Sequence, residues 1–139
     1  MSKTLSVIYC DDIRHEVGNK FSLMGCYSTI MYVATFPTIL PKLSVHTTIK
    51  LPLGESFKRI TVSMTNDGKE IATYDIEAAP NSATQDENQA VNEQTLIGGF
   101  TMASFELTGE TTLEVSAVFD GEFVYGDKLE VKAAPIIKS

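Results

Sequence analysis

Alternation of apolar and polar residues between Leu43 and Leu51 is the feature that most constrains the fold. Leu43, Val45 and Ile49 alternate with hydroxyl, histidine and lysine side chains over this stretch. Successive side chains of a β-strand point to opposite faces, so the segment predicts a strand with one buried and one solvated face. The segment from Leu113 to Phe119 repeats the pattern.

Less regular β-rich runs extend the pattern to most of the chain. They cover about 4–10, 20–33, 57–65, 69–77, 96–107 and 122–132, with turn signals between them. A length of 139 residues is enough for one domain with its own core. We therefore predict an all-β fold, a single antiparallel, immunoglobulin-like β-sandwich of about eight strands over residues 1–139. The side chains expected in its core are those of Val7, Leu23, Val45, Ile49, Val62, Tyr74, Val115, Ala117 and Phe119.

Three connecting segments carry their own predictions. The turn 66–68 fits a two-residue or a three-residue loop, and we prefer the second because it places Val62 opposite Ala72 and keeps apolar residues on one face. Two prolines in 36–41 predict an extended crossover between sheets. The polar segment 78–95 predicts a mobile loop, with a short helix near 86–93 as the alternative.

Charge limits the classes of partner. The chain has 18 acidic against 11 basic residues, a net charge of −7. An acidic protein repels nucleic-acid phosphates and anionic lipid headgroups, so we expect neither nucleic acid nor membrane as a partner. The sequence has no signal-peptide pattern and no apolar run long enough to span a membrane, which predicts a cytoplasmic protein.

The two cysteines are expected to be reduced thiols in that compartment. If the first two strands form a hairpin around 11–19, Cys10 faces Lys20 and Cys26 faces a residue near Thr4. That offset lies beyond the reach of a disulfide bond.

A polar segment between the first two apolar runs holds most of the chain's reactive side chains. Its candidate residues are Asp11, Asp12, Arg14, His15, Glu16 and Lys20. On one interpretation, an aspartate caps a turn and Arg14 forms an ion pair with a carboxylate. On the other, the segment is a recognition surface for a protein partner. We expect a structural role for Asp11, Asp12 and Arg14, and a surface role for His15, Glu16 and Lys20.

Catalytic interpretations of this segment are weaker. Asp11, Asp12, His15 and Glu16 are metal-ligand types, but neighbouring residues on an extended chain point apart and no spaced ligand motif is present. A nucleophile made of Cys10 and His15 lacks an orienting third group. We therefore predict no catalytic residue, no metal and no cofactor, and we expect His46 on the polar face of its strand to be a surface histidine.

The N-terminal pattern resembles an uncharacterised bacterial family classed as a domain of unknown function. The resemblance rests on the run CDDIR at 10–14, then Glu16, Lys20, Ser22, Gly25 and Tyr27, followed by Pro37 and Leu40-Pro41. It extends over most of the chain, including Val118-Phe119-Asp120-Gly121-Glu122. It implies a bacterial or prophage origin and a β-sandwich, and it implies no activity.

Three functions follow in order of preference. The first is a non-enzymatic cytoplasmic module that binds another protein, or a second copy of itself, through loops or an edge strand. The second is a ligand- or calcium-binding domain like a C2 sandwich, with ligands from Asp11, Asp12, Asp120 and Glu122 if both connections lie at the same end. The third is an enzyme that uses the segment around CDDIRHE.

Overall fold

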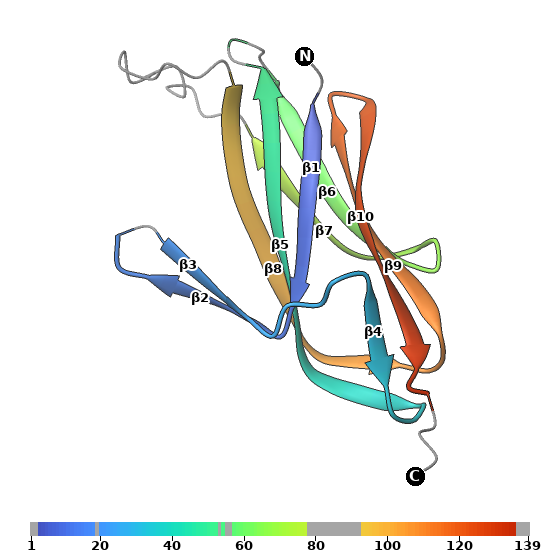
Figure 1. Ribbon diagram of the computed structural model, residues 1–139. Helices are drawn as coiled ribbons and strands as arrows, with labels where there is room; N and C mark the ends of the chain where they lie inside the picture. The colour runs from blue at the N-terminus through green and yellow to red at the C-terminus, as the bar shows by residue number, and fades with distance from the viewer. Residues whose placement is uncertain (1–2, 19, 53, 55–56, 78–92, 136–139) are drawn as a thin grey trace.

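The computed structural model shows an all-β protein and describes residues 3–18, 20–52, 54, 57–77 and 93–135 (Figure 1). The described residues form the strands β1 (Thr4–Cys10), β2 (Asp12–Glu16), β3 (Lys20–Met24), β4 (Ile30–Val33), β5 (Thr38–Pro52), β6 (Arg59–Asn66), β7 (Lys69–Glu77), β8 (Glu93–Leu107), β9 (Thr111–Phe119) and β10 (Glu122–Ala133). None of the described residues forms a helix long and apolar enough to cross a membrane.

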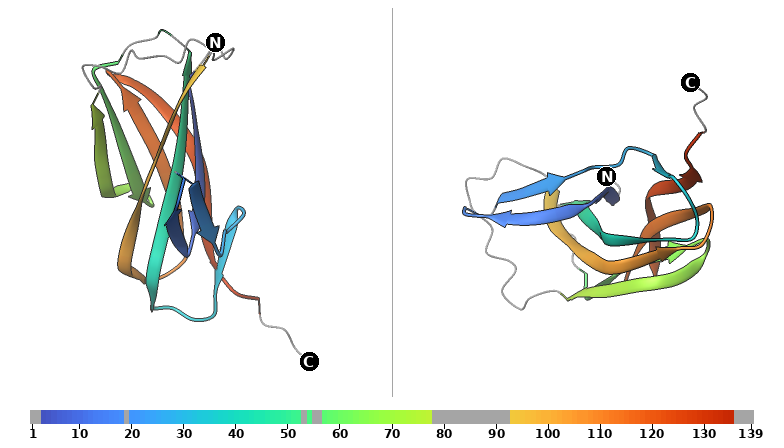
Figure 2. Two further views of the ribbon diagram at one scale, coloured as in Figure 1. Left: turned by 90° about the vertical axis from the view of Figure 1, so that its left-hand side faces the viewer. Right: turned by 90° about the horizontal axis from the view of Figure 1, so that it is seen from below.

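Two sheets pack face to face and enclose the core (Figure 2). One has three strands in the order β1-β5-β8, and the other has five in the order β4-β10-β9-β6-β7. The alternation predicted for β5 and β9 is confirmed, because Val45, Ile49, Val115 and Ala117 are fully buried between the sheets. Val7, Val62 and Phe119 are buried as expected, whereas Leu23 and Tyr74 are only half-buried.

The architecture differs from a single antiparallel sandwich of about eight strands. A third, two-stranded sheet is formed by β2 and β3, and β4 pairs with β10 in the parallel direction. The run predicted as one strand over 20–33 is divided into β3 and β4. Gly25, just after β3, adopts the left-handed region at φ 66°, which turns the chain out of the strand.

Neither register considered for the turn 66–68 is correct. Asp67 and Gly68 form a two-residue loop with φ 53° and 88°, the left-handed pair typical of a tight hairpin. An extra residue in β7, Ile71, then shifts the ladder, so that Val62 faces Tyr74. The bulge, and not the length of the loop, keeps apolar residues on the core face.

Two further segments differ from expectation. Thr38–Leu40 belong to β5 and pair with β8, so most of the predicted crossover 36–41 is strand. Pro41, which has no N–H to donate, lies across from Ser104, where the ladder is interrupted and φ is 53°. Of the predicted loop 78–95, residues 78–92 lie outside the described part of the chain, and the remaining residues begin β8.

Candidate functional site

The polar segment after β1 is the first strand of a hairpin that projects from the body of the molecule (Figure 1). β2 and β3 pair from Asp12 opposite Met24 to Glu16 opposite Lys20. β1 itself pairs with β5, so the expected hairpin of the first two apolar runs is wrong. Apolar residues at Ile13 and Leu23 on one face of the hairpin explain why so charged a sequence forms a strand.

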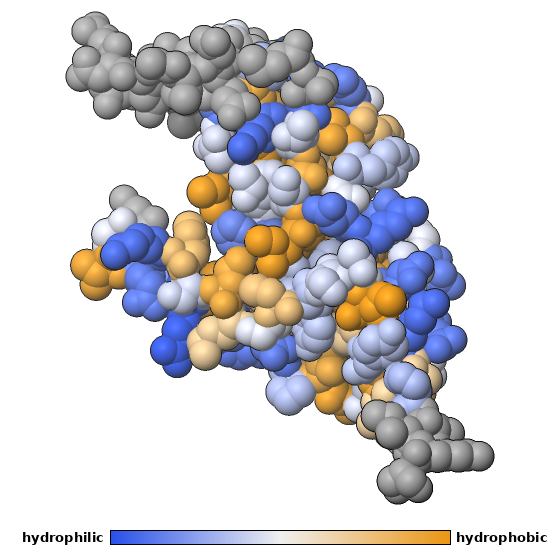
Figure 3. All heavy atoms as spheres, in the orientation of Figure 1, coloured by the Kyte–Doolittle hydropathy of each residue, from blue (hydrophilic) through white to orange (hydrophobic). Residues whose placement is uncertain are grey.

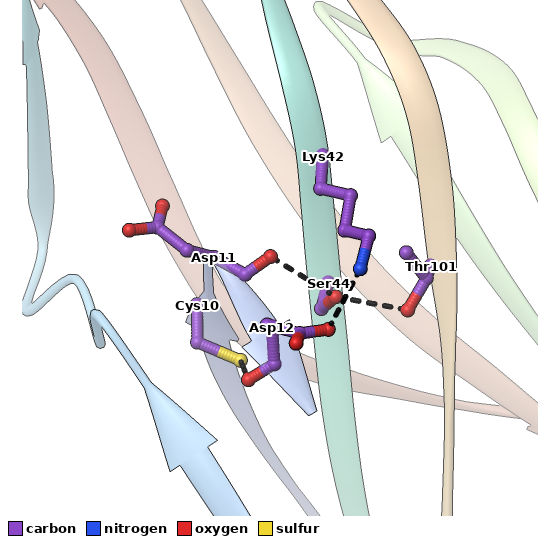
Figure 4. Close-up of polar contacts among 6 residues, drawn as sticks. All are labelled: Cys10, Asp11, Asp12, Lys42, Ser44 and Thr101. Carbon is purple, nitrogen blue, oxygen red and sulfur yellow. Dashed lines mark hydrogen bonds and ion pairs between the residues drawn. The ribbon is translucent and has the colours of Figure 1, made fainter. Parts of the chain in front are cut away.

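Asp11 fixes the base of this hairpin to the three-stranded sheet. Its Oδ1 accepts a hydrogen bond from the Tyr27 hydroxyl at 2.6 Å. Its carbonyl oxygen accepts one from Ser44 Oγ at 3.4 Å (Figure 4). Ser44 is fully buried and also shares a hydrogen bond of 2.9 Å with Thr101. Burial, together with the bond to Asp11, raises the pKa of Tyr27 to about 12.

Asp12 and Arg14 have different environments. Lys42 Nζ lies 3.2 Å from Asp12 Oδ1, and Cys10 Sγ donates to the Asp12 carbonyl at 3.5 Å (Figure 4). The Lys42 side chain is 53 % exposed, so this ion pair adds little stability. Arg14 lies exposed across from Ser22 and forms no ion pair with any residue that the structure describes, so the ion pair expected for it is not found.

The six candidate residues of the polar segment do not form one cluster. Strand alternation separates His15, which faces the body, from Arg14 and Glu16 on the opposite face. Glu16 accepts a hydrogen bond from Ser22 Oγ at 3.2 Å and lies directly across from Lys20. The structure thus places two aspartates at the base of the hairpin, three exposed charges on one face and one imidazole on the other.

The face that carries His15 covers a cleft of about 270 Å³. The hairpin forms one wall, and the outer surface of β5 and β8 forms the other. In the space-filling view the hairpin protrudes from the body, and apolar side chains gather where the two meet (Figure 3). The described residues that line it include no aspartate, glutamate, lysine or arginine, and are Ile13, His15, Phe21, His46, Ile97, Gly98, Gly99, Phe100 and Thr101.

Phe21 lies between two imidazole rings in this cleft. Its ring centroid is 5.0 Å from that of His15 and 5.4 Å from that of His46, both in edge-to-face geometry. Nδ1 of His46 is buried and has no hydrogen-bond partner among the described residues. Desolvation lowers the pKa of His46, which favours the neutral ring at neutral pH. The cleft therefore offers a largely apolar surface, and the unsatisfied ring nitrogen lies buried in its wall.

Sequence reasoning missed this cleft. His46 is half-buried, not a surface histidine, because the hairpin covers that face of β5. A signal was available in the consecutive Gly98 and Gly99, because glycines within a strand mark close approach or an open surface.

The geometry does not support the C2-like alternative, and the surroundings of Cys10 do not favour a catalytic thiolate. Glu122 forms an ion pair of 2.6 Å with Lys3, which lies just before the start of β1. Asp11 follows the end of β1, about 20 Å away along the strand. The acidic residues of the C2-like prediction thus lie at opposite ends, and no group of three or more metal-ligating side chains occurs in the described ranges. Burial raises the pKa of the Cys10 thiol to about 11, the reverse of what a nucleophile requires.

The fold and the cleft define a class: an all-β protein of two packed sheets with an added hairpin that encloses an uncharged surface. A family model covers residues 5–132, and the chain belongs to this family of unknown function, DUF6941. The resemblance to a family of unknown function is confirmed at that level, and the implied bacterial or prophage origin stays a prediction. Searches of curated proteins and of solved structures found no match to the chain.

Proposed function

We propose that this protein is a non-enzymatic, cytoplasmic binding module on an immunoglobulin-like scaffold. It takes up an extended segment of another protein along the outer edge of β8, next to the cleft. The observation that carries the proposal is the edge strand itself. β8 lies at the end of its sheet and has no charged residue from Gln94 to Phe105.

The other three edges of the two packed sheets are protected in ways that edge strands commonly are. On β1, the Val7 N–H donates to Asp127 Oδ2 at 3.0 Å, and the Tyr9 carbonyl accepts from Tyr27 N–H at 2.8 Å. β4 has only four residues. β7 carries four charged side chains, at Lys69, Glu70, Asp75 and Glu77. Within the part of the chain that the structure describes, the edge of β8 between Thr95 and Phe105 has none of these protections, which supports strand addition as the binding mode.

The surroundings indicate the chemistry of the partner segment. Ile97 on β8 is 52 % exposed and lines the cleft, so an apolar side chain of an added strand has a surface to cover. The net charge of −7 opposes association of two copies and favours a neutral or basic partner.

Peptide selection tests this proposal and does not require that the partner be identified first. The full chain is immobilised, random extended peptides are selected on it by display, and the enriched peptides are measured by calorimetry. We expect enrichment of uncharged, β-branched sequences whose affinity falls about tenfold or more in Ile97→Lys. The matched control is Phe123→Lys on β10, where the side chain is 63 % exposed and far from β8 in the sheet order.

Two results would count against the proposal. Peptides that bind Ile97→Lys as tightly as the wild type would exclude the edge of β8 as the binding surface. The second result comes from sedimentation velocity, which measures the oligomeric state. A wild-type dimer that Ile97→Lys dissociates would show that a second copy, and not another protein, pairs with β8.

A further inference from the structure

The backbone hydrogen bonds at the base of the hairpin bring the segments of Cys10 and Cys26 side by side. The Tyr27 N–H donates to the Tyr9 carbonyl at 2.8 Å, and the Asp11 N–H is shared between the Met24 carbonyl at 2.9 Å and the Gly25 carbonyl at 3.2 Å. In an antiparallel ladder, two such bonds flank a pair of residues that lie directly opposite without hydrogen bonds of their own. That pair is Cys10 and Cys26, not Cys10 and Lys20 as the sequence led us to expect.

The spacing of such a pair suits a disulfide bond. Directly opposite residues at non-hydrogen-bonded positions have α-carbons about 4.5 Å apart, with both side chains on the same face. A disulfide needs α-carbons about 4.4–6.8 Å apart. The Cys10 thiol donates to the Asp12 carbonyl at 3.5 Å, and this hydrogen bond is given up when the disulfide forms. The electrostatic effect of Cys26 on Cys10 is a further sign that the two thiols are close.

We propose that Cys10 and Cys26 form a reversible cross-strand disulfide that locks the base of the β2–β3 hairpin. The inference goes beyond binding at β8, because it concerns the control of the hairpin that forms one wall of the cleft. In a reducing compartment such bonds are transient and redox-sensing.

Glutathione disulfide is the oxidant in this scheme. Cys26 is exposed, so its thiolate attacks one glutathione sulfur, a mixed disulfide forms and one glutathione thiolate leaves. The buried Cys10 thiol then loses its proton, its sulfur attacks Cys26 Sγ and the second glutathione thiolate leaves. Two protein thiols are oxidised, one glutathione disulfide is reduced, and the two released protons are taken up by the two glutathione thiolates. The second attack is the slow step, since burial raises the pKa of Cys10 to about 11.

Intact mass spectrometry in glutathione redox buffers tests this proposal on the full-length chain. After acid quenching and alkylation, we expect an oxidised wild-type species that has lost two hydrogen atoms and carries no glutathione, with the bridge mapped to residues 10 and 26. Cys10→Ala should instead accumulate a stable glutathione adduct on Cys26. The bridge should also form at a lower ratio of oxidised to reduced glutathione in native buffer than in urea, because the fold aligns the thiols.

Several outcomes would overturn it. A persistent wild-type adduct of glutathione, or two alkylated thiols at every ratio, would show that the pair does not close. A bridge that forms more readily in urea would show that the native ladder does not position the thiols. These measurements use wild-type protein, so they remain valid even if Cys10→Ala does not fold.

Limited proteolysis tests whether the disulfide locks the hairpin. Tryptic cleavage after Arg14 and Lys20 should slow about tenfold on oxidation, and unchanged cleavage would argue against a locked hairpin.

Discussion

Gly99 on β8 lies directly across from His46 on β5, and a β-carbon added to Gly99 would overlap the carbonyl oxygen of Val45. The close approach of the two strands therefore depends on the missing side chain. We predict that Gly99→Ala forces the strands apart and lowers the free energy of unfolding by about 1–3 kcal/mol, measured by urea denaturation.

Gly109→Ala is the matched control for this variant. A β-carbon at Gly109 meets no atom within 4 Å and the backbone there does not require glycine, so we expect a change below about 0.5 kcal/mol. Equal losses in the two variants would show that close strand approach is not what Gly99 provides.

The core gives a second prediction. Phe119 is 3 % exposed and Val115 is fully buried between the sheets. Truncation of either residue to alanine removes apolar contacts and leaves a cavity, which should cost about 2–5 kcal/mol in chemical unfolding. Phe123→Ala removes a ring that is 63 % exposed and should cost less than about 0.5 kcal/mol. Losses below that level at both buried positions would place the core elsewhere.

Tyr27 and Arg14, both close to the hairpin, should differ in their effect on the stability of the protein. Tyr27→Phe removes only the hydroxyl that donates to Asp11, and should lower the free energy of unfolding by about 1 kcal/mol. Arg14→Ala, at an exposed side chain with no ion pair to a described residue, should leave the melting midpoint nearly unchanged. If Arg14→Ala proved the more damaging variant in thermal melts, the structural role that the sequence suggested for Arg14 would be restored.

The desolvation of His46 predicts how the stability of the folded protein changes with pH. Its pKa in the folded protein lies below its ordinary value of 6.5, because desolvation disfavours the charged ring. As pH falls below about 6.5, the unfolded chain therefore takes up a proton that the folded protein does not, and stability decreases until pH reaches the lowered pKa. Denaturant titrations from neutral to mildly acidic pH should show a smaller acid loss for His46→Gln than for the wild type. Parallel curves would contradict this role.

Local patterns explain how much of the fold could be predicted. Alternation in β5 and β9 identified Val45, Ile49, Val115 and Ala117 as core because a period of two residues is visible within one strand. The register of β6 and β7 was missed because the bulge at Ile71 leaves no mark in composition. β2 was missed because its charges suggested a connection.

The candidate site was beyond sequence reasoning for a different reason. Phe21, His46 and Ile97 come from three segments that lie far apart in the sequence, and only the folded arrangement of the hairpin over the sheet brings them together. The reactive residue types at 11–16 drew attention to the hairpin itself, while the cleft that it covers is lined by residues that carry no charge.

The parallel pairing of β4 with β10 has a consequence for synthesis on the ribosome. Met31 is paired with Val131, so most of the chain must be made before β4 can acquire its strand partner. Until then Met31 and Val33, both buried in the finished fold, lack the neighbour that covers them. Pairings between distant segments slow folding and expose apolar strands in the nascent chain. A chain stalled before β10 is therefore a natural client for chaperones that hold unfolded polypeptide during translation.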